Sequence, residues 1–294
     1  MNKMLGNKKA ILIFTLPTLI IFTLIVFYPI IQTFYRSFYD WDGLGKATFS
    51  GLENYINLFR DDLFYQSTLN GFIFAAILVT LQIGAATLLA LALLNRNLRF
   101  KRFLKTSFFI PVVLSVTVVC QLWSSIYNPE FGLINHIFEL MKISYRQDWL
   151  SNMHLAIYAV AFVNVWQYTG YQLAIIYGGA KAIPDDYVEA AMIDGATAAQ
   201  INRKIILPML RDTYRVCYIF AITGGLNAYA QMNLMTKGGP GTSTYTLTYM
   251  TFREAFTIGD YGYGCTAAVM LVVQCLLATV LINKLLSQKD SISF

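Results

Sequence analysis

Long uncharged stretches dominate the pattern of hydrophobic and polar positions along the chain. Cutting the sequence at every Asp, Glu, Lys and Arg leaves six long windows, at 10–35, 63–95, 106–129, 149–180, 216–236 and 261–283. A helix needs about 20 mainly apolar residues to cross a bilayer, so each window is long enough. We therefore predict transmembrane helices at about 10–35, 69–94, 106–127, 153–180, 216–236 and 262–284.

Composition supports this interpretation. Of the 294 residues, 56% are hydrophobic and only 13% are charged, which lies outside the usual range of soluble domains. We expect an all-α polytopic membrane protein with a single membrane domain over residues 1–294. The first window follows three lysines, as in a signal peptide. Its 26 uncharged residues, with no small-residue cleavage site after them, favour a retained anchor.

Basic residues are distributed unevenly between the connections. Fifteen of the 22 Lys and Arg residues fall before the first window, between the second and third, between the fourth and fifth, and after the last. The inner side of a membrane protein accumulates Lys and Arg, so we expect both termini in the cytoplasm. The net charge of +6 then reflects topology and contact with anionic lipid, and it requires no nucleic acid.

The polar segment 185–208, between the fourth and fifth windows, is predicted to form a bent cytoplasmic finger. Asp186 is expected to cap a first short helix, together with the glutamate three positions further on. Gly195 permits the left-handed conformation that ends this helix, and a second helix is expected from about Thr197 until Pro208 prevents its continuation. A helix of two turns is marginal in water, so the finger must pack either on its own bundle, as an ordinary connecting loop, or on a partner.

The finger also carries a recognisable signature. Its EAA, DGA and LP stretches resemble the EAA signature of the permease subunits of bacterial ABC importers. The flanking stretches NVWQYTGYQLAIIYGGAKAIPDDYVEAA and TKGGPGTSTYTLTYMTFREAF resemble the first of the two permeases of maltose-type carbohydrate importers. The resemblance implies the type I ABC importer permease fold, with six transmembrane helices and a coupling helix that contacts a cytoplasmic ATPase. The residues it assigns to this contact are Glu189, Ala190, Ala191, Asp194, Gly195, Ala196, Leu207 and Pro208.

The same resemblance implies a location in the bacterial cell (plasma) membrane and the partners of such a subunit. These partners are a second, homologous permease, two copies of a cytoplasmic ABC ATPase, an extracytoplasmic solute-binding protein, a sugar and the lipid bilayer. The sugar or oligosaccharide would pass from the binding protein into the cytoplasm by alternating access.

No catalytic, cofactor or metal motif is visible in the sequence. The windows leave no charged residue at membrane depth, whereas proton-driven carriers generally need one there. The stretch DGLGKAT at 42–48 lacks the glycine spacing of a phosphate-binding loop, and the His and Cys residues lack metal-site spacing. We therefore expect no cofactor in this chain, with ATP and Mg²⁺ bound by the partner ATPase.

Uncharged polar residues follow helical faces within three of the windows. Unpartnered amides and hydroxyls are costly in lipid, so these faces are expected to point toward the bundle or a cavity. Two interpretations remain open: hydrogen bonds between helices, or a lined substrate path. An uncharged amide and tyrosine lining suits the hydroxyls and flat faces of a sugar. The candidate path residues are Thr117, Gln121, Asn164, Gln167, Tyr168, Tyr171, Asn227, Tyr229 and Gln231.

The resemblance places the counterparts of Asn164, Tyr168, Tyr171 and Asn227 near the transported sugar. We also expect Gly225 to leave space beside Asn227. The outer segment 237–260 is too polar to span, and we expect a loop followed by a short helix near 247–256. A stand-alone secondary transporter and an integral membrane enzyme are the alternatives to the importer subunit; the first lacks intramembrane charge, and the second lacks any nucleophile–base pair.

Overall fold

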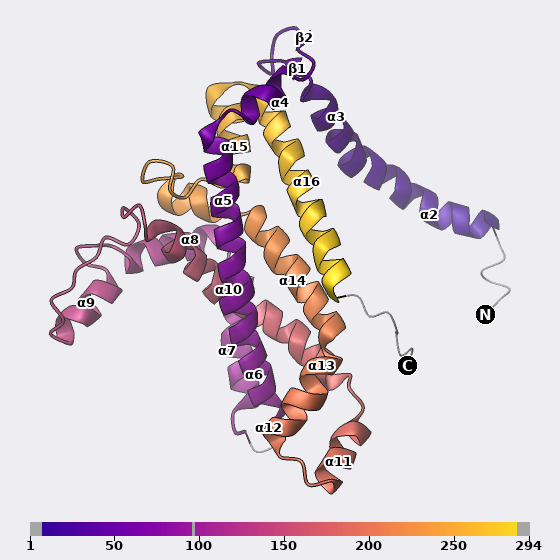
Figure 1. Cartoon of the computed structure of the whole chain (residues 1–294), viewed down its shortest axis with the longest axis vertical. Coiled ribbons are helices and arrows are strands. Elements are labelled where there is room, and N and C mark those ends of the chain that lie inside the picture. Colours follow the sequence, from indigo (N-terminus) through magenta and orange to yellow (C-terminus); the bar gives the residue numbers. More distant parts are fainter. Residues whose placement is uncertain (1–7, 96–97, 287–294) are drawn as a thin grey trace. The chain divides into compact units, whose positions relative to one another are not determined.

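The computed structural model describes residues 8–95 and 98–286, and within them the chain is almost entirely helical (Figure 1). The described residues contain one small sheet, an antiparallel pair of strands formed by β1 (Tyr39–Asp40) and β2 (Thr48–Phe49). The all-α class expected from the sequence is thus confirmed. Some basic residues used for the predicted orientation lie outside the described residues, namely Lys3, Arg96 and Lys289.

Close contacts group the residues into two compact units, and the first comprises the chain up to Asp61 together with residues 250–270. Asn54 anchors this unit, because its side-chain amide donates to the carbonyls of Ser37 and Tyr39 at 3.1 and 3.0 Å. Besides the strands, its elements are α2 (Lys8–Phe22), the π-helical turn η1 (Thr23–Phe27), α3 (Tyr28–Arg36), α4 (Glu53–Leu58), the end of α15 (Leu247–Phe252), η5 (Arg253–Ile258) and the start of α16 (Tyr261–Leu286).

The second unit contains residues 62–249 and the remainder of α16. Helix α10 packs against α5, α6, α7, α8 and α14. Gly170 permits its close approach to α7, since a Cβ there would stand 1.9 Å from the Phe108 carbonyl oxygen. The elements of this unit are α5 (Asp62–Ile77), η2 (Leu78–Gln82), α6 (Ile83–Leu94), α7 (Lys101–Val113), α8 (Val116–Ile126), α9 (Leu133–Leu140), α10 (Ala156–Lys181), α11 (Asp185–Ile193), α12 (Ala198–Ile201), η3 (Asn202–Ile206), α13 (Leu207–Met209), α14 (Arg211–Leu226) and η4 (Met232–Thr236).

Several helices have the length and apolarity of membrane spans. In the described part of the chain these are Ile11–Arg36, Asp62–Leu94 and Tyr261–Leu286, and the bent pair α7 and α8 adds a fourth if counted as one span. They coincide with the predicted spans near 10–35, 69–94, 262–284 and 106–127. Helix α10 covers residues 156–180 of the predicted span 153–180 and is 26 residues long. The count of six spans stays a prediction.

The predicted third span is not a straight helix. Helices α7 and α8 meet at an angle of 101°. The break falls at Leu114 and Ser115, whose ψ angles of 142° and 136° are extended. An extended residue interrupts the regular carbonyl-to-amide ladder, so its polar groups need other partners. The charge pattern carried no information about this bend.

The predicted fifth span is also interrupted. Helix α14 begins at Arg211 and ends at Leu226, and the chain resumes a helical course only before η4. Two threonines from the following segment satisfy carbonyls at the break: Thr248 donates to Leu226 at 3.0 Å, and Thr246 donates to Ala228 at 2.6 Å. Non-helical backbone at this depth is tolerated because protein groups supply the missing hydrogen bonds. The short helix expected near 247–256 is confirmed by α15 and η5.

The finger is bent as predicted, although its details differ. Gly195 has a φ of +78° and ends the first helix in the left-handed conformation. Asp186 does not cap α11: it lies in the first turn, and no side chain makes the cap hydrogen bond. The capping box belongs instead to Thr197 and Gln200 at the start of α12. Pro208 does not stop the second helix, because the π-helical turn η3 precedes it and the helix continues to Met209.

Candidate functional site

A cavity of about 470 Å³ lies within the second unit, between α10, α14 and the η2 turn. Its volume falls within the roughly 300–1,000 Å³ typical of small-molecule pockets. Six of the sequence-predicted path residues line it: Asn164, Tyr168, Tyr171, Asn227, Tyr229 and Gln231. The first three lie on one face of α10, and the other three follow the end of α14, where the helix breaks.

Three other predicted path residues do not line this cavity. Gln167 is buried, and its side-chain amide donates to the Leu114 carbonyl at 3.2 Å, where the bent span breaks. Thr117 and Gln121 are exposed on α8. Hydrogen bonding between helices was the alternative interpretation of the polar helical faces, and Gln167 makes a bond of this kind.

Two glutamines that the sequence patterns did not single out also line the cavity. The Gln82 amide nitrogen donates to the Tyr168 carbonyl at 3.3 Å, and that of Gln172 donates to the Cys217 carbonyl at 3.4 Å. Each keeps a side-chain oxygen that accepts no hydrogen bond from the described residues. The sequence did contain a signal for both residues. An amide side chain buried in a transmembrane window is costly unless it has a hydrogen-bond partner or a function.

Ring contacts order the cavity wall. Tyr171 packs edge-on against Phe220, with ring centroids 6.0 Å apart. Tyr229 stacks on Tyr249 at 6.2 Å. Asn227 donates to its own helix at the Thr223 carbonyl, at 2.9 Å. Amide and aromatic side chains thus line much of the cavity, and the rings of Tyr171 and Tyr229 contact rings on other elements.

Gly225 does not provide the expected space beside Asn227. A Cβ on Gly225 would lie 2.7 Å from the Ala75 Cα atom, so this glycine serves the close packing of α14 on α5. Gly224 lines the cavity instead, and a Cβ there would meet nothing within 4 Å. The expectation for Gly225 was wrong by one position, because successive helical residues point in directions about 100° apart.

The electrostatics of the cavity are simple. The described residues that line it include no Asp, Glu, Lys, Arg or His. Without such a group the lining offers no charged counter-ion to an anionic ligand. Its amides and tyrosine hydroxyls can exchange hydrogen bonds with an uncharged, hydroxyl-rich ligand, and its rings can stack on that ligand's apolar faces.

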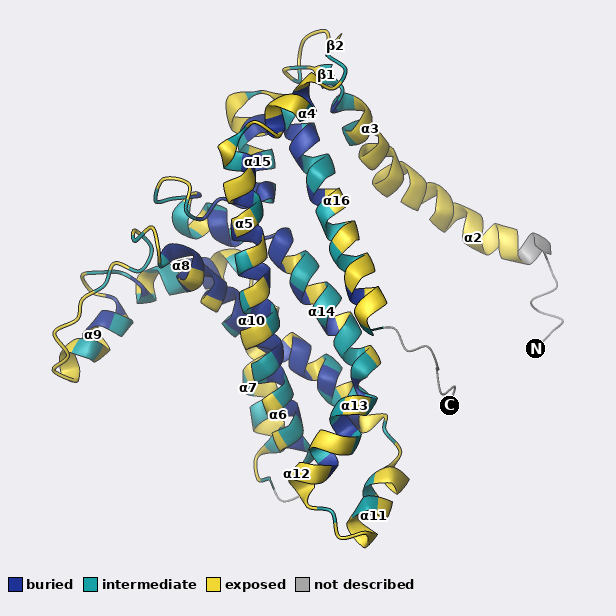
Figure 2. Ribbon diagram, viewed as in Figure 1, coloured by how far each residue is buried: buried dark blue, intermediate teal, exposed yellow. Residues whose placement is uncertain are grey.

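The finger is a second candidate site. All nine residues of α11 are at least partly exposed, as Figure 2 shows. Its last turn presents Met192 and Ile193 to solvent, the latter 86% exposed. Glu189 and Ala190 are also exposed. A two-turn helix that buries no side chain gains little from its own fold, which favours a partner surface over packing on its own bundle.

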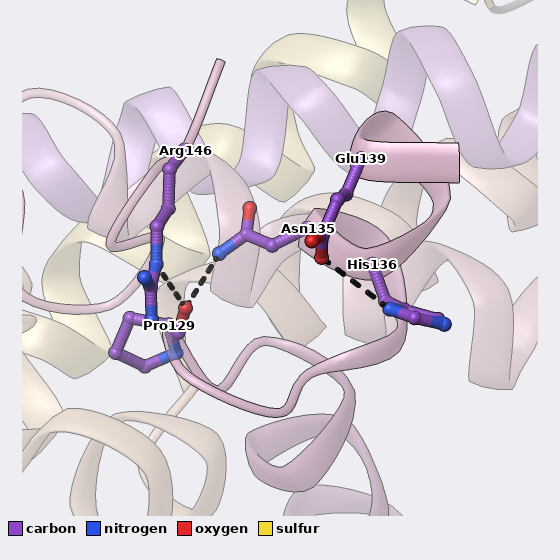
Figure 3. A network of polar contacts seen from close by, with 5 residues as sticks. All are labelled: Pro129, Asn135, His136, Glu139 and Arg146. Atoms are coloured by element: carbon purple, nitrogen blue, oxygen red, sulfur yellow. Dashed lines mark hydrogen bonds and ion pairs between the residues drawn. The ribbon is translucent and has the colours of Figure 1, made fainter. Parts of the chain in front are cut away.

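A polar network orders the connection between α8 and α10 (Figure 3). The Pro129 carbonyl accepts hydrogen bonds from the Asn135 amide at 3.3 Å and from Arg146 Nε at 2.7 Å. His136 and Glu139 form an exposed pair whose Nδ1 and Oε2 atoms lie 3.6 Å apart. The two bonds to Pro129 connect the loop before α9 with α9 itself and with the loop that follows it. None of the five residues lines the cavity.

In the first unit, Glu254 is a mostly buried carboxylate outside the membrane-spanning helices. Burial raises its pKa, and the nearby Asp260 and Asp61 carboxylates act in the same direction. Arg253 opposes the shift through an ion pair of 3.0 Å. A carboxylate in this position is a source of pH-dependent stability.

Comparison with known families decides the class of the protein. The profile of the binding-protein-dependent transport system inner membrane component family matches residues 10–289. The chain belongs to this family. It is a multi-pass membrane permease of a binding-protein-dependent importer, and the resemblance found in the EAA stretch is confirmed.

Curated relatives of this permease match it over nearly its whole length. The probable ABC transporter permease protein YurN of Bacillus subtilis is 33% identical over 270 residues, which cover 91% of this chain and 92% of YurN. The trehalose/maltose transport system permease protein MalF of Thermococcus litoralis is 28% identical over 270 residues, covering 92% and 90% of the two chains. These relatives are transport permeases, so this permease is a transport subunit and not an enzyme.

Solved structures show the same fold. One chain of a bacterial alginate ABC transporter, in complex with alginate pentasaccharide-bound periplasmic protein, superposes with a TM-score of 0.83 at 19% identity, covering 96% of both chains. A chain of a bacterial ABC transporter involved in the import of alginate reaches 0.85 at 18% identity, covering 98% of this permease and 99% of that chain. The expected ABC importer permease fold is confirmed.

Proposed function

We propose that this permease passes an uncharged sugar or oligosaccharide through the cavity between α10 and α14. The observation that carries the proposal is the lining itself, which combines amides and tyrosines with no charged side chain among the described residues. Named relatives act on such solutes: trehalose and maltose for MalF of Thermococcus litoralis, and multiple sugars for MsmF of Streptococcus mutans. Asn164, Tyr168 and Tyr171 on α10 are the proposed core of the path.

We further propose that the exposed finger couples this movement to ATP hydrolysis on separate subunits. Glu189 supplies the polar contact, Ala190 and Ala191 allow close approach, and Gly195 sets the bend. The complete importer would contain a second, homologous permease, two copies of a cytoplasmic ABC ATPase that bind ATP and Mg²⁺, and an extracytoplasmic solute-binding protein. The complex of the alginate transporter with its periplasmic protein supports the last of these partners.

We also propose that the finger and both termini lie in the cytoplasm. The excess of Lys and Arg on that side supports this orientation. In the described chain, Lys101, Arg102 and Lys105 on α7 and Arg203 and Lys204 on η3 belong to this set.

Purification through a tag on this chain tests the proposal. In mild detergent the chain should bring down a second permease and an ABC ATPase. The reconstituted complex should then accumulate a neutral sugar only with its binding protein outside and ATP at the finger side. ATP-independent uptake by the chain alone would contradict the proposal and favour a secondary transporter.

A further inference from the structure

A second cavity, of about 700 Å³, lies in the groove between α7 and α10 and shares no lining residue with the sugar cavity. Phe109, Ile110 and Val113 line it from α7, and Leu173 and Ala174 line it from α10. Most of these side chains are exposed, with Ile110 at 55% and Val113 at 75%. The groove is therefore an open apolar surface on the described part of the molecule.

Glycines and their spacing explain why the groove opens toward one end. At Gly170 the two helices touch, since a Cβ would stand 1.9 Å from the Phe108 carbonyl oxygen. Two turns further along α10, a Cβ on Gly178 would meet nothing within 4 Å. Helices α7 and α10 therefore diverge toward the end of the groove that carries Gly178 and the first turns of α7.

Lys105 lines the groove at this open end and is the one cationic residue among the described residues of its lining. Lys105 extends over the ring of Tyr177, with its ammonium nitrogen 3.8 Å from the ring centroid. Thr106, with its hydroxyl, is the neighbouring lining residue. Lys101 and Arg102 precede them on the same helix, and the sequence from 95 to 129 contains no acid. The open end thus carries a positive charge that no carboxylate of the described residues pairs with, while the remainder of the groove is apolar.

We propose that the groove between α7 and α10 binds an anionic phospholipid, with an acyl chain along the apolar wall and the phosphate at Lys105. Basic pockets between transmembrane helices on the cytoplasmic side recognise acidic headgroups, and apolar grooves accept the chains. Charge complementarity favours this ligand over a helix of another subunit, because an apolar helix would leave the Lys105 ammonium without an anion. We assign this lipid to the cytoplasmic leaflet on the basis of the orientation proposed above.

Lipid retained by the purified importer tests this site. The complex is reconstituted into vesicles of equal parts phosphatidylglycerol and phosphatidylcholine, re-extracted, and its bound lipid is measured by mass spectrometry. Phosphatidylglycerol should be enriched several-fold over the vesicle composition. Lys105→Gln should abolish the enrichment, while the matched control Lys101→Gln, outside the groove lining, should keep it. Ala174→Phe, which fills the groove, should lower the retention of both lipids.

Several results would overturn the proposal. Equal enrichment in wild type and Lys105→Gln would remove the role of the lysine. An equal loss in Lys101→Gln would indicate diffuse attraction to a basic surface. A photoreactive residue at Val113 should cross-link to lipid; cross-linking to another polypeptide would show that a subunit covers the groove. Size-exclusion profiles of the variants confirm that the importer is still assembled, and sugar uptake by the wild type is scored separately, so that failure of the lipid site and of the transport function are distinguishable.

Discussion

The side-chain amide of Gln167 on α10 donates a hydrogen bond of 3.2 Å to the main-chain carbonyl of Leu114, the residue at which α7 ends. The bond joins the central helix to the break in the bent span. Because Gln167 is 1% exposed, neither lipid nor water replaces this donor when it is removed. We expect it to help hold the 101° bend that carries the chain from α7 into α8.

Gln167→Leu should therefore destabilise the permease. Interhelical hydrogen bonds in membranes contribute about 0.6 to 2 kcal/mol, so a loss of that size is expected in the free energy of unfolding. Thermal unfolding of the purified complex measures it. Gln121→Leu, an exposed position on α8, is the control and should leave the midpoint unchanged. An unchanged midpoint for Gln167→Leu would mean that the bend does not depend on this bond.

The neighbouring glycines of α14 should respond oppositely to substitution. Gly225→Ala places a methyl group against Ala75, where the approach of 2.7 Å forces the helices apart. Overpacking of this kind costs about 1–3 kcal/mol. Gly224→Ala enters open space and should be tolerated. Thermal unfolding distinguishes the two variants, and equal midpoints would contradict the packing described for this helix.

A larger side chain at Gly224 should change which sugars pass. Gly224→Leu narrows the cavity, so the rate of uptake should fall more for longer oligosaccharides than for a monosaccharide. The measurement is a comparison of transport rates in vesicles across a series of chain lengths. An equal reduction for every length would show that the cavity does not extend to this position.

Gly195 should be essential for coupling and not for insertion. Its φ of +78° is strained for any residue with a Cβ. We expect Gly195→Pro and Glu189→Lys to remain in the membrane while losing uptake and stimulated ATP hydrolysis. Gly84→Ala, at a helical position where a Cβ meets nothing within 4 Å, is the control. Normal ATPase stimulation in both finger variants would refute the coupling assignment.

Glu254 should contribute more stability to the first unit in acid than at neutral pH. A carboxyl group with a raised pKa holds its proton more tightly in the folded state than in the unfolded state. Its contribution is therefore present below the usual carboxyl pKa and is lost as pH rises through the raised value. Glu254→Gln should remove this part of the pH dependence and leave stability at neutral pH equal or higher. A large loss at neutral pH would mean that the Arg253 ion pair outweighs burial.

The sequence located several long apolar helices because absence of charge is a property of each segment alone. The windows around α5–α6, α10 and α16 needed no tertiary information, and the EAA stretch located the finger. The bend at Leu114 was not visible, since an extended residue inside an apolar run leaves no charge or periodicity signal. Gly224 and Gly225 are identical in sequence, and only the packing of α14 on Ala75 distinguishes them.

Part of the candidate site was also predictable, because helical spacing, like absence of charge, is a property of one segment alone. Asn164, Tyr168 and Tyr171 share one helical face, which the spacing revealed. Gln167 lies among them in sequence, yet turns to the broken span. Gln82 is an isolated amide in an apolar run, so only the folded bundle brings it to the cavity. Gln172 follows Tyr168 by four positions, so it shares the helical spacing that marked Asn164 and Tyr168.

The central claim is that the cavity is a sugar path, and Tyr168→Ala and Asn164→Ala test it most directly. In proteoliposomes containing the assembled importer, each variant should lower sugar transport per complex roughly two- to tenfold, the loss expected from one hydrogen bond. The affinity of the binding protein for sugar should not change. Tyr158→Ala, an exposed tyrosine on the same helix outside the cavity lining, should transport normally. Unchanged transport per assembled complex in Tyr168→Ala and Asn164→Ala, with only a loss of assembly or thermal stability, would contradict the account.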